Sequence, residues 1–156
     1  MSDADGDAKA VEAANSAFYT AVESADVDLL GAIWVDGPGA HDASCVHPGW
    51  PALRGRTDIL RSFAVILANT PYIQFFLTDV EVRVVGDLAL VTCAENILTA
   101  VDVDDAEGRS GLTGGRVVAT NVFRRSSAGW RLWVHHASPV LAGDGDEDDD
   151  EEADDR

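Results

Sequence analysis

Histidines are the side chains of this chain best suited to proton transfer, and His47 occupies the most informative position among the four. It stands directly before Pro48 at the end of a short apolar run. An imidazole titrates near neutral pH, so His47 could act as a general base or, alternatively, be a structural histidine hydrogen-bonded at a strand end. His41 and Asp42 lie just before it, but their spacing matches no known metal motif. We therefore expect a base candidate here and no metal ion.

Two alternating segments near the C-terminus predict a β-hairpin. Residues 116–125 and 130–138 each show the two-residue period of a strand, and the turn 126–129 separates them. Pairing Arg125 with Trp130 across this turn fixes which residues lie opposite one another.

This register predicts a cluster of polar groups on one face of the sheet. Asn121, Phe123 and His136 would share that face, while His135 would point to the other. If the preceding loop closes in the same way, Asn96 lies opposite Asn121. Amides and an imidazole in an apolar wall need partners, and either a bound ligand or mutual hydrogen bonding could supply them.

Three helices should precede these strands. Apolar residues three or four apart predict a helix over residues 9–22; Asp26 can cap a second short helix, and Thr57 a third. The two-residue period predicts strands at Ser44–His47, Ile73–Val85, Leu88–Val101, Arg116–Arg125 and Trp130–Ser138. Gly86-Asp87 forms a tight turn, and residues 102–115, with four acids and four glycines, form a mobile loop. The order of elements indicates an α+β domain with helices on one face of a curved antiparallel sheet.

Charge and composition narrow the classes of function. The net charge is −17, and residues 144–156 alone hold ten acids and one arginine. We expect a disordered N-terminus over residues 1–8, one domain over residues 9–141 and a disordered acidic tail over residues 142–156 that aids solubility or binds a partner. The single lysine and ten arginines favour a halophilic archaeon or a high-GC bacterium, or codon bias alone. The acidity disfavours nucleic acid, and the absence of a long apolar run predicts a cytoplasmic protein without a membrane span or anchor.

Cys45 and Cys93 each fall inside an apolar strand pattern and lack the spacing of metal ligands. We expect both to be buried free thiols.

The segments Ser126–Ser138 and Val46–Arg56 resemble the SnoaL-like branch of the superfamily named for nuclear transport factor 2 and ketosteroid isomerase. This resemblance implies a cone-shaped sheet with the three N-terminal helices on its concave face. It fixes a fold better than a reaction, because this fold hosts isomerases, cyclases, epoxide hydrolases and binding modules. Trp-Arg at 130–131 with His136 and Ser138 is also similar to the association domain of calcium/calmodulin-dependent kinases, where the fold serves to oligomerise.

The resemblance carries three positions onto this chain. His47, before Pro48, stands where the ketosteroid isomerases have their proton-abstracting aspartate, and Asn121 stands at the aspartate of their oxyanion hole. The tyrosine of that hole falls on Phe18, which cannot donate, with Tyr19 beside it. One missing donor costs about 3 kcal/mol of transition-state stabilisation, which argues against steroid isomerisation.

The sequence thus favours a homodimer that binds a small, mostly hydrophobic ligand, with acid–base chemistry of the isomerase, cyclase or lyase type on a carbonyl or enol. The alternative is a non-catalytic oligomerisation or interaction module. No cofactor is expected. The candidate catalytic residues are His47, Asn121 and His136, and the candidate ligand-binding residues are Phe18, Tyr19, Trp34, Trp50, Asn96 and Phe123. For Trp34 and Trp50, packing is the alternative to stacking on a ligand.

Overall fold

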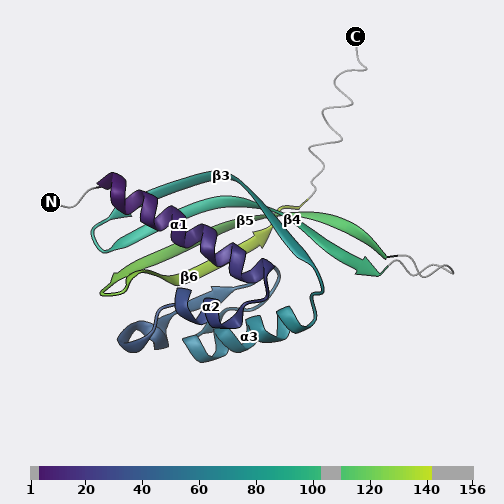
Figure 1. The fold of residues 1–156 in the computed structure, drawn as a ribbon, viewed down its shortest axis with the longest axis horizontal. Helices are drawn as coiled ribbons and strands as arrows, with labels where there is room; N and C mark the ends of the chain where they lie inside the picture. Colours follow the sequence, from purple (N-terminus) through teal and green to yellow (C-terminus); the bar gives the residue numbers. More distant parts are fainter. Residues whose placement is uncertain (1–3, 103–109, 142–156) are drawn as a thin grey trace, which may run out of the picture.

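The computed structural model describes residues 4–102 and 110–141, and it has the predicted α+β architecture (Figure 1). The helices are α1 (Ala4–Glu23), α2 (Val27–Ile33) and α3 (Arg56–Ala68), with a 3-10 helix η1 (Gly37–Asp42) after α2. The strands are β1 (Ser44–Val46), β2 (Leu53–Arg54), β3 (Ile73–Val85), β4 (Leu88–Asp102), β5 (Ser110–Ser126) and β6 (Gly129–Pro139).

The six strands form one curved sheet in the order β2-β1-β6-β5-β4-β3. Neighbouring strands are antiparallel except β1 and β6, which run parallel, so the expected antiparallel sheet is in fact mixed. Helix α1 crosses one face and packs on β3, β4 and β6, while α2 and α3 lie against the β6 and β1 side (Figure 1). The helices and this face of the sheet enclose the hydrophobic core.

Bulges bend the sheet at two places. In β3 the pairing with β4 shifts between Thr78 and Glu81, and Asp79 takes a positive φ of 55°. The pairing of β5 with β6 shifts between Val122 and Phe123, which leaves Trp133 as an extra residue in β6. An extra residue in one strand increases the local twist and reverses the side of every residue after it.

Local sequence explains most element boundaries. The Asp26 side chain accepts a hydrogen bond from the Leu29 N–H and caps α2, as predicted. Gly86 adopts φ 61° in the predicted tight turn between β3 and β4. The predicted cap at Thr57 is wrong: only Gly55, with φ 87°, separates β2 from α3, and it occupies the capping position without a side-chain hydrogen bond.

Two other predicted boundaries also need correction. Helix α1 begins at Ala4 rather than residue 9, and two hydrogen bonds of 2.9 Å from Arg125 to the Asp7 carboxylate hold its first turns. Strands β4 and β5 stay paired as far as Asp102 and Ser110, so the proposed loop is shorter than expected. Its remainder, residues 103–109, and the predicted acidic tail lie outside the described residues.

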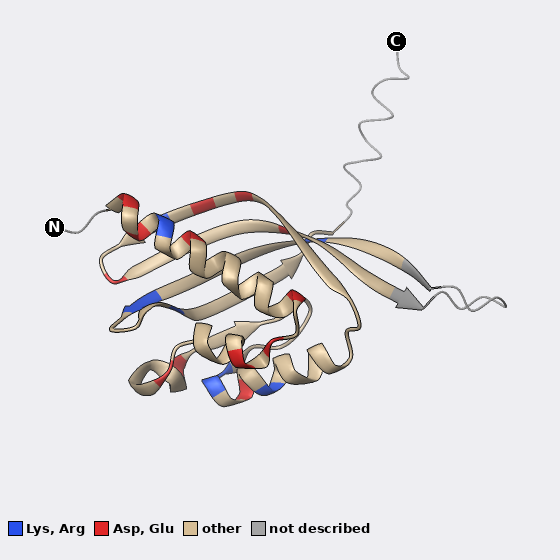
Figure 2. Ribbon diagram, in the orientation of Figure 1, with Lys and Arg blue, Asp and Glu red and all other residues tan. Residues whose placement is uncertain are grey.

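Charged residues are spread along the helices, the turns and the long strands (Figure 2). Glu95 on β4 differs from the other carboxylates whose burial is described, because its side chain is 3% exposed. Cys45 and Cys93 are buried free thiols, as predicted. Among the described residues, no helix is long and apolar enough to cross a membrane.

Candidate functional site in the cone interior

The space between the helices and the sheet contains an unusual number of polar side chains. Among the described residues, six polar or charged ones are buried there. Five lie on five different elements and His47 directly follows β1; the six are Asn15, His47, Ser62, Glu95, Asn121 and His135. Buried polar groups must be hydrogen-bonded to be tolerated. The hydrogen bonds divide these residues into two clusters.

The larger cluster, called the interior network below, joins Asn15, Tyr19, Glu95, Asn121 and His135. The Tyr19 hydroxyl donates to Glu95 Oε2 at 2.5 Å. Asn121 Nδ2 donates to Asn15 Oδ1 at 2.8 Å and to the Tyr19 oxygen at 3.1 Å. His135 Nδ1 lies 2.6 Å from Asn121 Oδ1. The chain of bonds thus links α1, β4, β5 and β6.

The direction of these bonds assigns a tautomer to His135. Both contacts of Asn121 Nδ2 are donated, so its Oδ1 faces His135 and can only accept. His135 must therefore carry its proton on Nδ1. Its Nε2 then holds a lone pair and can accept a proton or a hydrogen bond.

The smaller cluster, called the histidine–serine pair below, sets the tautomer of His47 in the same way. The Ser62 hydroxyl donates its one proton to the Ile59 carbonyl at 2.6 Å, as a helical serine often does. It must then accept from His47 Nε2, 2.8 Å away. His47 Nδ1 is left as the basic nitrogen, with Cys45 Sγ at 4.0 Å.

Burial makes both histidines neutral at physiological pH. Desolvation lowers the pKa of His47 to about 4. Desolvation, with smaller repulsion from His47 and His136, lowers the pKa of His135 to about 3. Each imidazole therefore offers an unprotonated nitrogen at pH 7.

Burial has the opposite effect on the acids of the interior. It raises the pKa of Glu95 to about 7, although the hydrogen bond from Tyr19 opposes the rise. The pKa of Tyr19 is also raised, first by desolvation and then by the nearby Glu95. Glu95 is consequently the interior group whose protonation changes near neutral pH.

Aromatic rings pack against both clusters. The Phe18 ring lies 4.9 Å from the His135 ring and 5.8 Å from the Phe63 ring, which in turn lies 4.8 Å from the His47 ring. Trp34 packs against both phenylalanines. The interior thus presents two neutral imidazoles that both pack against one aromatic wall, formed by Phe18, Trp34 and Phe63.

The predicted site residues fall into three groups. His47 and Asn121 are buried among the interior polar groups, and Phe18, Tyr19, Trp34 and Phe123 are buried in the core around them. Trp50 is 43% exposed and its ring lies edge-on to His47 at 4.9 Å. The third group, His136 and Asn96, lies elsewhere.

The predicted placement of His136 is wrong. Up to Phe123–Leu132 the hairpin pairs as expected, but the bulge at Trp133 shifts the next pairs by one residue. Asn121 therefore faces His135, and His136 is exposed on the outer face of the sheet. The two neighbouring histidines exchange the sides that a regular hairpin would give them.

The predicted placement of Asn96 is wrong for a related reason. Because β4 and β5 continue further than expected, Asn121 pairs with Val91 and Asn96 pairs with Arg116. Asn96 lies on the outer face and donates to the Phe76 carbonyl at 2.8 Å. The inward position next to it belongs to Glu95.

Glu95, Asn15 and Ser62 were not identified from the sequence, although two of them left a signal. Glu95 follows Ala89, Val91 and Cys93 at two-residue intervals, so it continues the buried face of β4. Asn15 lies four residues after Val11 and four before Tyr19, on the apolar face of α1. A carboxylate or amide at an otherwise apolar position is the pattern to look for.

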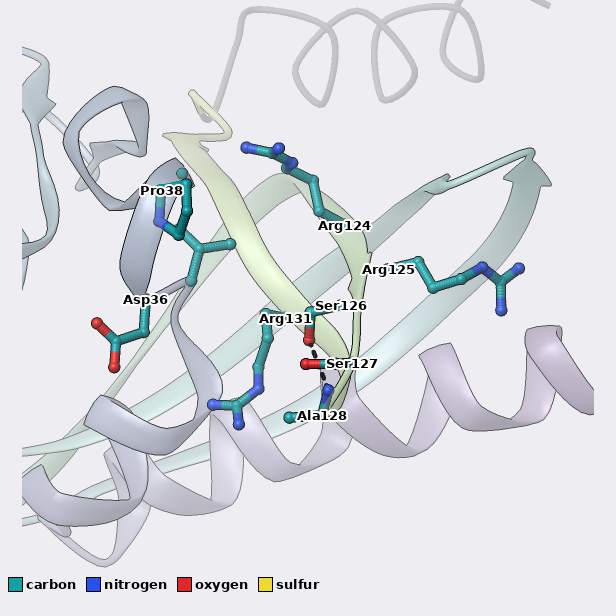
Figure 3. A pocket seen from close by; sticks show the side chains of 10 residues that line it. Asp36, Pro38, Arg124, Arg125, Ser126, Ser127, Ala128 and Arg131 are labelled. Atoms are coloured by element: carbon teal, nitrogen blue, oxygen red, sulfur yellow. Dashed lines mark hydrogen bonds between the residues drawn. The ribbon is translucent and has the colours of Figure 1, made fainter.

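A second polar feature lies at the surface, beside the β5–β6 turn. Arg124, Arg125 and Arg131 line a pocket of about 410 Å³, called the arginine pocket below (Figure 3). Their guanidinium groups extend in different directions, so they do not converge on one point (Figure 3). Arg125 pairs with Asp7 at 2.9 Å and Arg124 with Asp42 at 3.8 Å. These pairings favour a structural role for the arginines.

Two further pockets lie at the surface. One, of about 530 Å³, is lined by residues around the start of α3. The other, of about 430 Å³, is lined by residues of β3, β4 and β5. His47, Asn121 and His135 line neither of them. Within residues 4–102 and 110–141, no three His, Cys, Asp or Glu side chains are grouped so that they could hold a metal ion.

Comparison with known proteins gives the same family from sequence and from fold. A family model described as a SnoaL-like domain matches residues 11–142. The chain is 55% identical to a solved protein from Streptomyces avermitilis described as a candidate dehydratase of the NTF2-like family, over 90% of this chain and 100% of that one, with a TM-score of 0.81. It is 27% identical to a candidate calcium/calmodulin-dependent protein kinase type II association domain from Thiobacillus denitrificans, over 83% and 94%, with a TM-score of 0.67.

A curated relative is more distant. The F-box protein SKIP8 of Arabidopsis thaliana is 22% identical over 136 residues, which are 87% of this chain but 52% of that protein. The chain therefore spans about half the length of the curated relative it matches.

Proposed function

The chain belongs to the SnoaL-like domain family, and on that premise we propose that it binds a small, mostly hydrophobic ligand in the cone and performs acid–base chemistry on it. The ligand class is a carbonyl or enol compound, and the reaction is of the isomerase, cyclase or lyase type. The description of the Streptomyces avermitilis protein as a candidate dehydratase favours the lyase. The observation that carries the proposal is that a buried acid with a pKa of about 7 shares one interior with two neutral imidazoles of fixed tautomer.

His47 is the proposed base. Its Nδ1 is unprotonated at neutral pH, and Ser62 fixes the ring by accepting from Nε2. It would take a proton from the carbon next to the ligand carbonyl, and the electron pair of that C–H bond would move onto the oxygen as an enolate. Protonated Glu95 would return a proton, to carbon in an isomerisation or to a departing hydroxyl in a dehydration.

Asn121 and His135 are proposed to hold the acid in place. Asn121 connects His135 to Tyr19, whose hydroxyl reaches Glu95. His135 takes the role that the sequence analysis gave to His136, because only His135 faces the interior. Trp50 is proposed to cover the entrance, since it is exposed while the His47 side chain beneath it is 5% exposed.

Proton exchange at carbon tests this function without knowledge of the natural substrate. We expect the protein to accelerate exchange of the α-protons of 2-tetralone for deuterium in D₂O, followed by NMR. His47→Gln should slow the catalysed exchange by a factor of about 10² to 10⁴, the usual contribution of a general base. His136→Gln is the matched control, because it changes an exposed histidine of the neighbouring face. A wild-type rate equal to that of buffer would refute the proposal.

A non-catalytic assembly role is the second candidate, and the outer face of the sheet favours it. Phe76 is 52% exposed and Val118 is 48% exposed on that face, beside the groove of about 430 Å³. Exposed apolar groups of this size often mark interfaces. We propose that two copies pair through this face as a homodimer. Light scattering on the wild type and on Phe76→Glu tests it: a monomer for the wild type at micromolar concentration would exclude the role.

A further inference from the structure

Trp34 is a buried member of the aromatic wall whose backbone is held by hydrogen bonds on both sides. It follows the last residue of α2, and its backbone N–H donates to the Leu30 carbonyl at 3.1 Å. Its own carbonyl accepts from Arg56 at 3.1 Å, and the next residue, Val35, donates to Leu132 of β6 at 2.9 Å. The indole ring is fully buried. Because the backbone is held on both sides and the ring is enclosed by Phe18 and Phe63, the indole N–H faces the interior rather than solvent.

The indole N–H of Trp34 has no hydrogen-bond partner. Within the described part of the chain, Trp34 Nε1 stands alone among buried side-chain nitrogen and oxygen atoms in this respect. The neighbouring buried donors and acceptors of the interior network satisfy one another. An unpartnered buried donor destabilises the folded state, so its presence calls for a physical explanation.

The surroundings of Trp34 connect it to the proposed site. Its ring lies 6.3 Å from the Phe18 ring and 6.2 Å from the Phe63 ring. Phe18 also contacts His135, and Phe63 also contacts His47. Each of the two phenylalanines therefore contacts both the indole and one of the imidazoles.

We propose that an oxygen of the bound ligand accepts a hydrogen bond from Trp34 Nε1. This inference rests on the proposed function and deepens it by assigning an orientation to the ligand. The carbonyl or enol oxygen lies toward Trp34, and the adjacent C–H lies toward His47 Nδ1. A carbonyl or enolate oxygen is an acceptor only and cannot bond to the two imidazole lone pairs; the indole N–H can donate to it and stabilise the negative charge that develops there. The aromatic rings around the indole favour a cyclic or aromatic ligand that carries this oxygen on its apolar ring.

The test uses 2-naphthol, an enol-shaped fluorescent probe, with Trp34→Phe and Trp133→Phe. Both variants keep an aromatic ring and remove one indole N–H. Trp133 is the matched control because its Nε1 already donates to Asp42 at 2.9 Å near the surface. We expect Trp34→Phe to weaken naphthol binding about tenfold, because it removes the proposed donor to the ligand oxygen. Trp133→Phe should leave binding unchanged.

NMR of the wild-type protein gives a second readout that does not depend on a variant. The indole ¹H–¹⁵N signal of Trp34 should move downfield as naphthol is added, and that of Trp133 should stay in place. If the wild type binds naphthol but Trp34→Phe binds it equally well and the Trp34 signal does not move, this inference is wrong and the proposed function survives. If the wild type neither binds naphthol nor exchanges protons of 2-tetralone, both are wrong.

Discussion

The interior network and the arginine pocket are both polar clusters, yet they differ in almost every physical respect. The interior network joins α1, β4, β5 and β6 through hydrogen bonds between buried side chains. The arginine pocket is lined by side chains that reach separate partners in contact with solvent. In the interior, each group depends on its neighbours because water cannot replace them; at the surface, water and salt can. Burial therefore distinguishes the interior network, a candidate site, from the arginine pocket, whose contacts only stabilise the surface near a turn.

The largest expected effect comes from removing the central residue of the interior network. Asn121→Ala leaves His135 Nδ1 without its acceptor and Asn15 Oδ1 without its donor, so we expect a loss of about 3 kcal/mol in the free energy of unfolding. Asn96→Ala is the control, because Asn96 bonds near the surface on the outer face; its cost should stay within about 1 kcal/mol. Urea denaturation measures both. Equal losses would mean that burial does not distinguish the two amides.

The second effect is that Glu95 makes the free energy of unfolding depend on pH. Its pKa rises from an ordinary 4.5 to about 7 in the folded protein, so the folded state holds this proton more tightly than the unfolded chain does. The stabilisation is full below pH 4.5 and is lost as the pH rises through about 7. Relative to Glu95→Gln, the wild type should therefore lose stability between pH 5 and 8, as thermal unfolding at several pH values would show.

His47 and His135 make stability depend on pH in the opposite direction, and the Glu95→Gln variant separates their contribution from that of Glu95. The pKa values of His47 and His135 are depressed, so their stabilisation is present above pH 6.5 and is lost as the pH falls through about 4 and 3. Because Glu95→Gln keeps both histidines, the difference between the two proteins isolates Glu95. A difference that stays constant from pH 5 to 8 would contradict the raised pKa.

A smaller effect, on the pKa of His47, should follow from exposing its imidazole to water. Trp50→Ala removes the ring that lies against this imidazole and admits water. Because desolvation is what lowers the pKa of His47, the pKa should move up from about 4 toward 6.5, while the fold stays intact. A proton NMR titration of the imidazole resonances of the wild type and the variant measures it. An unchanged His47 pKa would show that Trp50 is not its cover.

The smallest effect belongs to the arginine pocket. Arg125→Gln removes the two hydrogen bonds to Asp7 and the stacking of the guanidinium on Trp130 at 4.4 Å. The pair lies at the surface, with Arg125 36% and Asp7 17% exposed, so we expect only a slight drop in the thermal midpoint, which concentrated salt should reduce. A loss as large as that of Asn121→Ala would place the first turns of α1 among the determinants of stability.

The sequence by itself determined the three helices, the long strands and their order, but not η1 or β2. Asp26 caps α2 through its own neighbours, Gly86 supplies the positive φ of a tight turn, and the two-residue period marks the long strands. Such features depend on residues close in the chain, so local patterns suffice to predict them. The inward positions of His47, Asn121 and Phe123 followed from the same patterns together with the family resemblance.

Only the tertiary structure decided which polar side chains meet. One extra residue at Trp133 turns His135 inward and His136 outward, and the longer pairing of β4 with β5 gives the inward position to Glu95 rather than Asn96. A strand reverses sides with every residue, so an offset of one changes the whole site while the local pattern stays the same. The pKa values follow from that choice, because burial and the partners across α1, β4, β5 and β6 set them, and no short stretch of sequence contains those partners.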